Sequence, residues 1–359
     1  MPSFDPRQLE QYAVALLAAA GATAEEAELV GKSLVNANLC GYDSHGVMRL
    51  PFYVQAMADG EVVSRAPLEV LQESSTRIVA DAHWGFGQVQ ATQMLQRLST
   101  LAIENGLAVG TMIHCGHIGR LGEYCEMAAA RELVSMLMVN SHGAAVRVAP
   151  PGGKAPRLST NPLAIGVPNG DEPLVLDFST SATAEGKVRV KKIAGQQVPD
   201  GWLLDSEGRP TNDPNTLYGS PPGSILPMGG AQAYKGFGLG LMIEILTGAL
   251  SGGVCAREKP FPKKGNCVFI LLLNPASFGG QSHFQAEVAQ LVAYQRSCPR
   301  IDGVDRILLP GDPERMAMQQ RLAHGVELDT ENWVQLAHLG EKLNVARITP
   351  IGRNGYASG

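Results

Sequence analysis

The sequence lacks the features that mark several common classes of protein. Its 29 Lys and Arg are outnumbered by 34 Asp and Glu, giving a formal net charge of −5. A nucleic-acid partner normally requires a basic face, so none is expected. The most apolar stretch, GFGLGLMIEILTGAL, is too short to span a bilayer and contains Glu244, so no membrane partner is expected either. The N-terminal segment carries acidic and polar residues in its periodic pattern, unlike a signal peptide, and we expect a cytoplasmic protein.

Paired cysteines are also missing. The chain has six cysteines and no CxxC pair, and several lie in apolar segments, as Cys267 does in NCVFILLLN. Disulfide frameworks and zinc knuckles require closer and more regular spacing. The cysteines are therefore predicted to be free and mostly buried, and no metal site is predicted.

A complete Rossmann glycine fingerprint is absent as well. In GFGQVQ (85–90) the third glycine is replaced by Gln90, and YKGFGLG (234–240) has no clear strand before it. The glycines at 116, 119 and 122 do not form GxGxxG either. A dinucleotide, if one binds here, is not expected to bind in the usual Rossmann way.

What the sequence does contain is an alternation of strand and helix patterns, which predicts a mixed α/β core. Helices are expected at both ends of the chain, packed together outside that core. Two Gly/Pro-rich passages are expected to be loops, over 148–162 and 195–233. The predicted strands are 68–72, 76–82, 107–113, 134–140, 163–168, 174–179 and 266–274. The predicted helices are 6–20, one capped by Thr23 and Glu26, 47–59, 87–105, 121–132, 235–250, 283–296 and 312–343, the last divided by Gly325.

The segment DSHGVMR (43–49) is the first candidate for chemistry. His45 and Arg49 are four residues apart at the start of a predicted helix, so one face can present both. Ser44 is a candidate N-cap, and Asp43 is a candidate to orient the histidine. Reduction of a 2-oxo acid needs an arginine for the carboxylate, a histidine for the proton and a reduced nicotinamide. A surface turn with an exposed His and Arg remains the alternative.

His117 is a second candidate acid/base, because it follows the predicted strand 107–113, and strand ends favour catalytic groups. A helix-capping role is its alternative. Two further segments suit a phosphate-bearing cofactor: Lys235-Gly236 at a helix N-terminus, and the strand end at 177–181. Simple capping is the alternative for both. The residues of that strand end are Asp177, Phe178, Ser179, Thr180 and Ser181.

Two other classes of function are weaker hypotheses. The first is a metal-dependent lyase or hydrolase, but no nearby carboxylate pattern completes its site. The second is a catalytically silent binding protein, which the presence of both candidate histidines and Arg49 disfavours. The metal hypothesis would use His45, His83, His114, His117 and His142.

Seven ordered segments, spread over nearly the whole chain, resemble the type-2 malate/L-lactate dehydrogenase family. That family also includes ureidoglycolate, sulfolactate and diketogulonate enzymes and a cyclic-imine reductase. Within it, NANLCGYDSHG, GHIGRLG, GALSGG and ILLPGD are most similar to the hydroxycarboxylate dehydrogenase B type. The seven segments are DSHGVMRLPFY (43–53), HIGRLGEY (117–124), TNPLAIGVP (160–168), LDFSTSATAEGKVRV (176–190), GWLLDSEGRPTNDP (201–214), YKGFGLGLMIEILTGALSGG (234–253) and LLPGD (308–312).

The resemblance implies an α/β fold that binds a nicotinamide cofactor, NAD or NADP, without being a Rossmann fold, of the sulfolactate dehydrogenase-like type. It implies a homodimer and a division into 1–67, a helical part; 68–310, the α/β core with cofactor segments; and 311–359, helices that pack with the first part. The implied activity interconverts a 2-oxo acid and its 2-hydroxy acid, with reduction of a cyclic imine as the alternative.

The resemblance also implies roles for individual residues. Ser44, His45 and Arg49 match the substrate-pocket motif, with Arg49 as carboxylate clamp, and both His45 and His117 match histidines proposed as the acid/base. Two departures from the family pattern are Ser159, where glycine is common, and Asp312, where glutamate is common; the serine would be strained if its φ were positive. Ser141 matches a polar active-site contact. Cofactor contacts are implied at Asp177, Phe178, Ser179, Lys235, Gly236, Pro310, Gly311 and Asp312.

Overall fold

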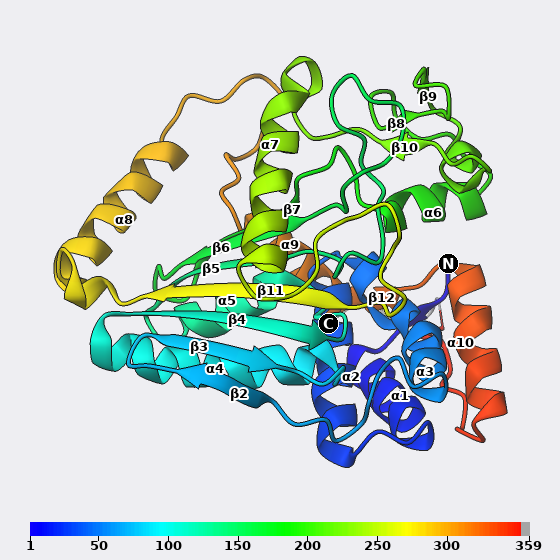
Figure 1. The fold of residues 1–359 in the computed structure, drawn as a ribbon, viewed down its shortest axis with the longest axis horizontal. Coiled ribbons are helices and arrows are strands. Elements are labelled where there is room, and N and C mark those ends of the chain that lie inside the picture. The colour runs from blue at the N-terminus through cyan, green and yellow to red at the C-terminus, as the bar shows by residue number, and fades with distance from the viewer. Residues whose placement is uncertain (353–359) are drawn as a thin grey trace.

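A seven-stranded mixed sheet forms the centre of the computed structural model, which describes residues 1–352 (Figure 1). Neighbouring strands are antiparallel except β3 and β4, which are parallel and joined by α4 (Gly87–Asn105). The predicted α/β class with a mixed sheet is confirmed. In spatial order the strands are β2 (Glu69–Glu73), β3 (Arg77–Asp81), β4 (Leu107–Cys115), β11 (Asn266–Leu273), β5 (Val134–Val139), β6 (Pro162–Val167) and β7 (Leu174–Ser179).

Helices cover both faces of this sheet. On one face α4 and α5 (Leu121–Ala129) bury a large apolar cluster that includes Met94, Met112 and Tyr124. On the other face α7 (Ala233–Glu244) crosses β5 and β6, and then continues as a π-helical turn over Ile245–Ala249 (Figure 1). Amphipathic helices on a sheet with two apolar faces explain why the central strands read as continuous apolar runs.

The two ends of the chain pack into one helical layer beside the sheet. It contains α1 (Pro6–Ala19), α2 (Ala24–Leu39), α3 (Leu50–Ala58) and α10 (Thr330–Lys342), whose apolar side chains form one cluster. The strand β1 (Ser3–Phe4) pairs with β12 (Val326–Glu327), and the Phe4 and Trp333 rings lie 4.3 Å apart. The predicted capping box of Thr23 and Glu26 begins α2.

Three local predictions were wrong. Residues 47–49 form a 3₁₀ turn, so the third helix begins only at Leu50. The segment 195–233 is not entirely irregular, because it holds a small sheet of two-residue strands too short to show an alternating pattern. A further helix, α6 (Glu185–Ile193), was missed. The short strands are β8 (Leu203–Leu204), β9 (Pro210–Thr211) and β10 (Ser224–Ile225).

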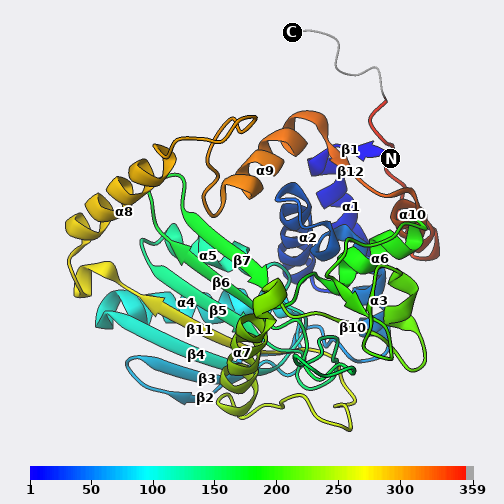
Figure 2. The ribbon, with the colours of Figure 1, turned by 90° about the horizontal axis from the view of Figure 1, so that it is seen from above.

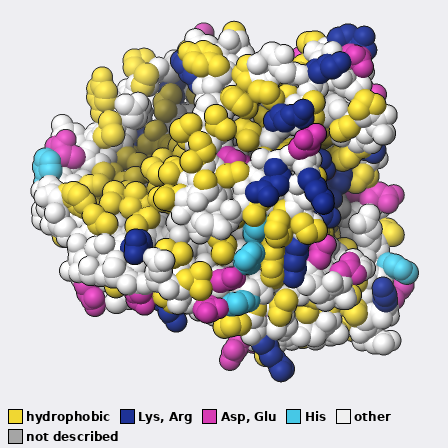
Figure 3. Space-filling view, viewed as in Figure 1, with side chains coloured by type: hydrophobic (Ala, Val, Ile, Leu, Met, Phe, Trp, Pro, Cys, Tyr) yellow, Lys and Arg dark blue, Asp and Glu magenta, His cyan; other side chains and the backbone are white. Residues whose placement is uncertain are grey.

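The helix α8 (Gln281–Arg296) extends away from the sheet and buries none of its 16 residues (Figure 2). Beside it, the space-filling view shows a hollow lined with apolar side chains over α8, α7 and the sheet (Figure 3). Leu176, Met242 and Leu291 are among the exposed apolar residues of these elements. Among residues 1–352, no helix combines the length and apolarity that crossing a bilayer requires.

The cysteines are free and mostly buried, as predicted. All six are free, and Cys40, Cys115, Cys125 and Cys267 are buried. Cys298 is exposed.

Candidate active site

Side chains from two distant helices hold the 43–49 segment in place. Asn38 of α2 donates to Asp43 Oδ1 (2.7 Å) and accepts the Val47 N–H (2.9 Å). Arg321 of α9 (Asp312–His324) pairs with Asp43 at 2.6 Å. Gly46 packs so closely that a Cβ there would lie 2.2 Å from the Asn38 side chain. Asp43 therefore anchors the loop and does not orient the histidine as expected.

The loop brings His45 against His117. The two rings stack with centroids 5.5 Å apart and planes inclined by 28°. Ser44 makes no N-cap bond, contrary to expectation, and its Oγ lies 3.0 Å from His45 Nδ1. The structure thus joins the two segments that the sequence offered as separate candidates.

His117 is held by a short hydrogen-bond chain. Gln88 donates to Tyr53 Oη (2.9 Å), which leaves the Tyr53 hydroxyl proton for His117 Nδ1 at 2.8 Å. The Gly119 N–H also points to Nδ1, at 3.3 Å. These donors place the proton of the neutral His117 ring on Nε2. Among residues 1–352, neither His45 Nε2 nor His117 Nε2 has a hydrogen-bond partner.

Arg49 supplies positive charge beside both rings. Its Nε donates to the Ser44 carbonyl at 2.7 Å, and the side chain is half-buried. Burial, together with Arg49 and Arg120, lowers the pKa of His45 to about 3. Burial, Arg49 and His45 hold the pKa of His117 well below its ordinary value. Both rings are therefore neutral at pH 7.

Ser141 lies in the turn after β5, bonded to the backbone of Ala145: its Oγ donates to the carbonyl at 2.7 Å and accepts the N–H at 3.3 Å. Asn266 links this turn to the His117 segment, because its side chain donates to the Asn140 carbonyl and accepts the Ile118 N–H. No hydrogen bond within the described chain joins Ser141 to either histidine.

Two of the predicted cofactor segments meet at the end of β7. The Met228 N–H donates to the Thr180 carbonyl at 2.9 Å. Gly236 packs on Met228 so closely that a Cβ would lie 2.3 Å from its carbonyl oxygen. Lys235 is exposed in the first turn of α7. Asp177 accepts the Gly122 N–H at 2.7 Å, and burial raises its pKa to about 6 despite that bond and Arg120.

The third predicted cofactor segment lies at the opposite end of β7. The Val175 N–H donates to the Pro310 carbonyl at 3.2 Å, and Gly311 adopts a left-handed φ of 93° against Pro173. At 3.3 Å per residue, Val175 and Ser179 are about 13 Å apart along the strand. Ser159 has no positive φ, so the strain considered for it is absent.

The histidines of the metal hypothesis divide into two groups. His114 pairs with Asp81 at 2.8 Å and stacks on His142, away from the His45–His117 pair. His83 pairs with Glu69. Within residues 1–352 no group of three or more His, Cys, Asp or Glu is arranged to hold a metal ion.

Sequence reasoning missed the residues that position the site. Only Tyr53 had a visible signal, because it lies four residues after Arg49 and so falls on the same helix face. The others reach the site through tertiary packing, which no local spacing records. The missed residues are Asn38, Tyr53, Gln88, Asn266 and Arg321, with Glu185 and Arg189 of α6 acting electrostatically on Arg49.

Comparison with known proteins identifies the family. A family model described as malate/L-lactate dehydrogenase matches residues 4–337. The chain belongs to the malate/L-lactate dehydrogenase family. The predicted membership is confirmed, and with it the prediction of a 2-hydroxyacid dehydrogenase.

Individual relatives cover almost the whole chain. An L-lactate dehydrogenase of Cupriavidus necator is 37% identical, over 94% of this chain and 96% of the relative. Hydroxycarboxylate dehydrogenase B of Escherichia coli is 33% identical, over 96% of each chain, which confirms the predicted similarity to that type. The malate dehydrogenase structure from Pyrococcus horikoshii has a TM-score of 0.87 at 27% identity, over 96% and 97% of the two chains. A Δ1-piperideine-2-carboxylate reductase from Pseudomonas syringae has a TM-score of 0.82 at 29% identity, over 94% and 100%.

Proposed function

We propose that this family member interconverts a 2-oxo acid and its 2-hydroxy acid with NADH or NADPH. The observation that carries the proposal is the His45–His117 pair beside the Arg49 guanidinium, with both Nε2 atoms free of hydrogen-bond partners among residues 1–352. A planar guanidinium binds a carboxylate through two parallel hydrogen bonds, which fixes the orientation of the neighbouring carbonyl. Arg49 is assigned that role.

The two histidines differ in what they can do with a proton. The hydroxyl hydrogen of Ser44 can rotate, so Oγ can donate to His45 Nδ1 when the ring is neutral and accept from it when the ring is charged. His117 Nδ1 faces a backbone N–H that cannot turn into an acceptor. His45 is therefore assigned as the proton donor. His117 is assigned as a neutral Nε2–H donor that polarises the substrate oxygen, a known use of a low-pKa histidine.

Substrate binding prepares the proton donor. The carboxylate of the acid offsets the charge of Arg49, one of the causes that depress the pKa of His45. The pKa of His45 therefore rises when the acid binds, which favours an imidazolium at the position where negative charge develops on the substrate oxygen. The oxygen receives this proton as the carbonyl is reduced.

The residues of this chain fit a dinucleotide. The backbone cradle at Gly236 excludes any Cβ, and Lys235 places a cation over an exposed first turn whose N–H groups favour phosphate. Residues 177–181 and 235–236 are assigned to the cofactor, with 310–312 assigned to its distal part. When bound, the nicotinamide supplies a hydride to the carbonyl carbon. The Rossmann fold binds its dinucleotide on a mostly parallel sheet, whereas the central sheet here has one parallel pair of strands. This difference supports another mode of cofactor binding.

We also propose a homodimer, in a cytoplasmic enzyme with the parts 1–67, 68–310 and 311–359. The support for the dimer is the apolar hollow beside α8, a helix with no buried residue in the single chain (Figure 3). Exposed apolar surface of this extent is typical of an interface.

The test is initial-rate oxidation of NADH and of NADPH with pyruvate, oxaloacetate, phenylpyruvate, 2-oxoglutarate and a cyclic imine acid. Turnover of at least one 2-oxo acid is expected. Exclusive turnover of the cyclic imine would replace the proposal with imine reduction, which the likeness to the piperideine carboxylate reductase favours as second candidate. No turnover with any acid and either cofactor would refute both.

A further inference from the structure

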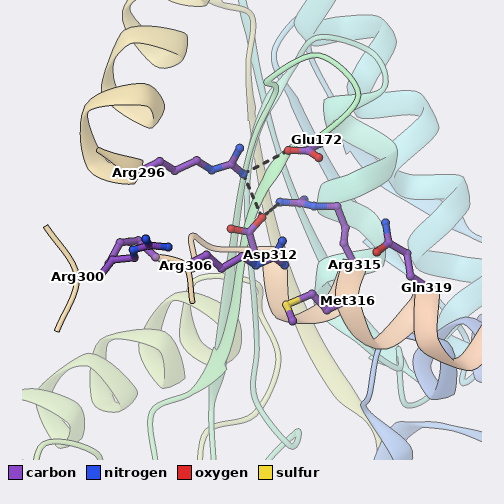
Figure 4. Close-up of a pocket in the computed structure, with 9 residues that line it drawn as sticks. Glu172, Arg296, Arg300, Arg306, Asp312, Arg315, Met316 and Gln319 are labelled. Carbon is purple, nitrogen blue, oxygen red and sulfur yellow. Dashed lines mark hydrogen bonds and ion pairs between the residues drawn. The ribbon is translucent and has the colours of Figure 1, made fainter. Parts of the chain in front are cut away.

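A cavity of about 280 Å³ opens between the end of α8, the segment 297–311 and the start of α9 (Figure 4). Its wall carries four arginines, Arg296, Arg300, Arg306 and Arg315. It adjoins the 310–312 segment but contributes nothing to the steps assigned above. So many arginines around one cavity are unusual in a chain with a formal net charge of −5.

The positive charge of this cavity is only partly balanced. Arg296 pairs with Glu172 and Asp312 at 3.3 Å each, and Arg315 pairs with Asp312 at 2.6 Å (Figure 4). Arg300 donates to the carbonyl of Asp305, and within residues 1–352 neither Arg300 nor Arg306 has a carboxylate partner. Two guanidinium groups are thus available to an anion from outside.

The buried carboxylate of the cavity is already fully engaged. Asp312 is 5% exposed; its Oδ2 accepts the Leu309 N–H at 2.8 Å, and its Oδ1 receives Arg315 and Arg296. Burial alone would raise the pKa of Asp312, but these donors hold it below its ordinary value. Recognition of NAD commonly uses a free carboxylate for the ribose 2′-hydroxyl, whereas NADP is recognised by arginine at the 2′-phosphate. Both carboxylate oxygens of Asp312 thus already accept hydrogen bonds from the protein.

We propose that this cavity binds the 2′-phosphate of NADP, and that the enzyme therefore prefers NADPH to NADH. The inference rests on the proposed function, because it places the adenosine end of the cofactor at 310–312. A phosphate monoester carries close to two negative charges at pH 7, and arginine binds its oxygens through paired hydrogen bonds. Arg300 and Arg306 are the groups assigned to it, with Arg296 and Arg315 held in position by Asp312.

The test compares adenosine 2′,5′-bisphosphate with adenosine 5′-monophosphate by isothermal titration of the intact protein. The wild type should bind the bisphosphate at least about tenfold more tightly, which corresponds to one charge-assisted contact. In the double variant Arg300→Ala/Arg306→Ala, the two nucleotides should bind within about threefold of each other. Both arginines are exposed, so the fold should persist. Arg209→Ala, which removes an exposed arginine paired with Asp205, is the matched control and should retain the preference.

A second measurement separates this inference from the proposed function. The ratio of kcat/KM for NADPH to that for NADH should fall at least about tenfold in the double variant, with kcat for NADH unchanged. If the wild type oxidises NADH but binds the two nucleotides equally tightly, the inference is overturned and the proposed dehydrogenase function stands. Equal loss of preference in Arg209→Ala would also overturn it. Inorganic phosphate that binds as tightly as the bisphosphate would show a site for a free anion and overturn the assignment to NADP.

Discussion

Two stacked histidine pairs lie at the same end of the central sheet, and they differ in almost everything except residue type. The His45–His117 pair lies beside Arg49 with planes inclined by 28°, and neither Nε2 atom has a hydrogen-bond partner within the described part of the chain. The His114–His142 pair is inclined by 18° and stacks with Trp84, under Lys263. Histidine content and spacing therefore do not identify an active site. The neighbouring guanidinium of Arg49 is what distinguishes the His45–His117 pair and makes it the candidate site.

Backbone geometry sharpens the contrast. His114 and His142 have φ values of 49° and 52°, and neighbouring His83 and Trp84 are also left-handed, at 46° and 62°. Such conformations persist only where surrounding structure enforces them. His142 is fully buried and neither ring nitrogen has a partner among the described residues. This pair is a packed structural element, whereas the His45–His117 pair is held by hydrogen bonds at one ring edge and left open at the other.

The largest effect should separate the two pairs directly. His45→Asn removes the proposed proton donor, and kcat for the 2-oxo acid should fall by about a thousandfold, within the usual range for general acid catalysis. His114→Asn changes the residue that bonds to Asp81, away from the proposed chemistry, and should change kcat by less than about threefold. Steady-state kinetics on both variants checks this. Equal losses in the two would erase the functional distinction between the pairs.

Removal of the Arg49 guanidinium should have the second-largest effect. Arg49→Ala should lower kcat/KM by about a hundredfold, mainly through a higher KM, because truncating one partner of a desolvated charge pair costs about 2–5 kcal/mol. Oxalate, an unreactive dianion, should also lose affinity in a calorimetric titration of the variant. Arg209→Ala serves as control because its arginine lies on the small sheet, paired with Asp205. Unchanged oxalate affinity in Arg49→Ala would remove the clamp from the mechanism.

The positioning chain behind His117 should have a smaller effect. Tyr53→Phe removes the hydroxyl that bonds His117 Nδ1 and Gln88, and kcat should fall by about tenfold, the value of one hydrogen bond to a reacting group. The pH profile of kcat should shift as well, because the tautomer of His117 is no longer fixed by that donor. A loss of stability with an unchanged pH profile would reduce Tyr53 to a packing residue.

The sequence predicted the sheet and the candidate residues that the structure brings together much better than the residues that support them. The strands were found because each is a run of β-branched and apolar residues bounded by turn signals, as in NCVFILLLN. His45, Arg49 and His117 were found because their residue types match the chemistry. Three supporting residues were missed. Asn38 and Arg321 bond to Asp43, from 5 and 278 residues away, and Gln88 bonds to Tyr53 from 35 residues away. Contacts at such separations depend on tertiary packing and leave no periodic trace.

The same limit explains the cofactor segments. Residues 177–181 and 235–236 converge through Met228, which no motif indicated. Residues 310–312 lie at the other end of β7, where the Val175 N–H donates to Pro310 and Gly311 packs against Pro173. The sequence predicted a cofactor contact for all three segments alike, and the fold shows that they lie at two different ends of β7.

The smallest effect is a pH dependence of stability, to which His45 and Asp177 contribute with opposite signs. His45 has a pKa of about 3 in the folded chain, below its unfolded value, so the unfolded state takes up a proton first as the pH falls below about 6.5. Stability is then lost between pH 7.5 and 5.5, by about 1 kcal/mol for this one group. Asp177 has a folded pKa of about 6, above its unfolded value, so the folded state takes up the proton first. Its contribution to stability therefore rises as the pH falls through 6, by somewhat less than about 1 kcal/mol at pH 5.5.

Denaturant unfolding at pH 7.5 and 5.5 measures both contributions. In His45→Asn the loss of unfolding free energy between the two pH values should be smaller than in wild type, because the group that disfavours folding in acid is gone. In Asp177→Asn the loss should be larger, because the opposing gain is gone and the amide oxygen can still accept the Gly122 N–H. His114→Asn, a substitution of the same type in the other pair, is the control and should follow the wild type. A smaller pH-dependent loss in His114→Asn than in His45→Asn would contradict the assignment of this effect to His45.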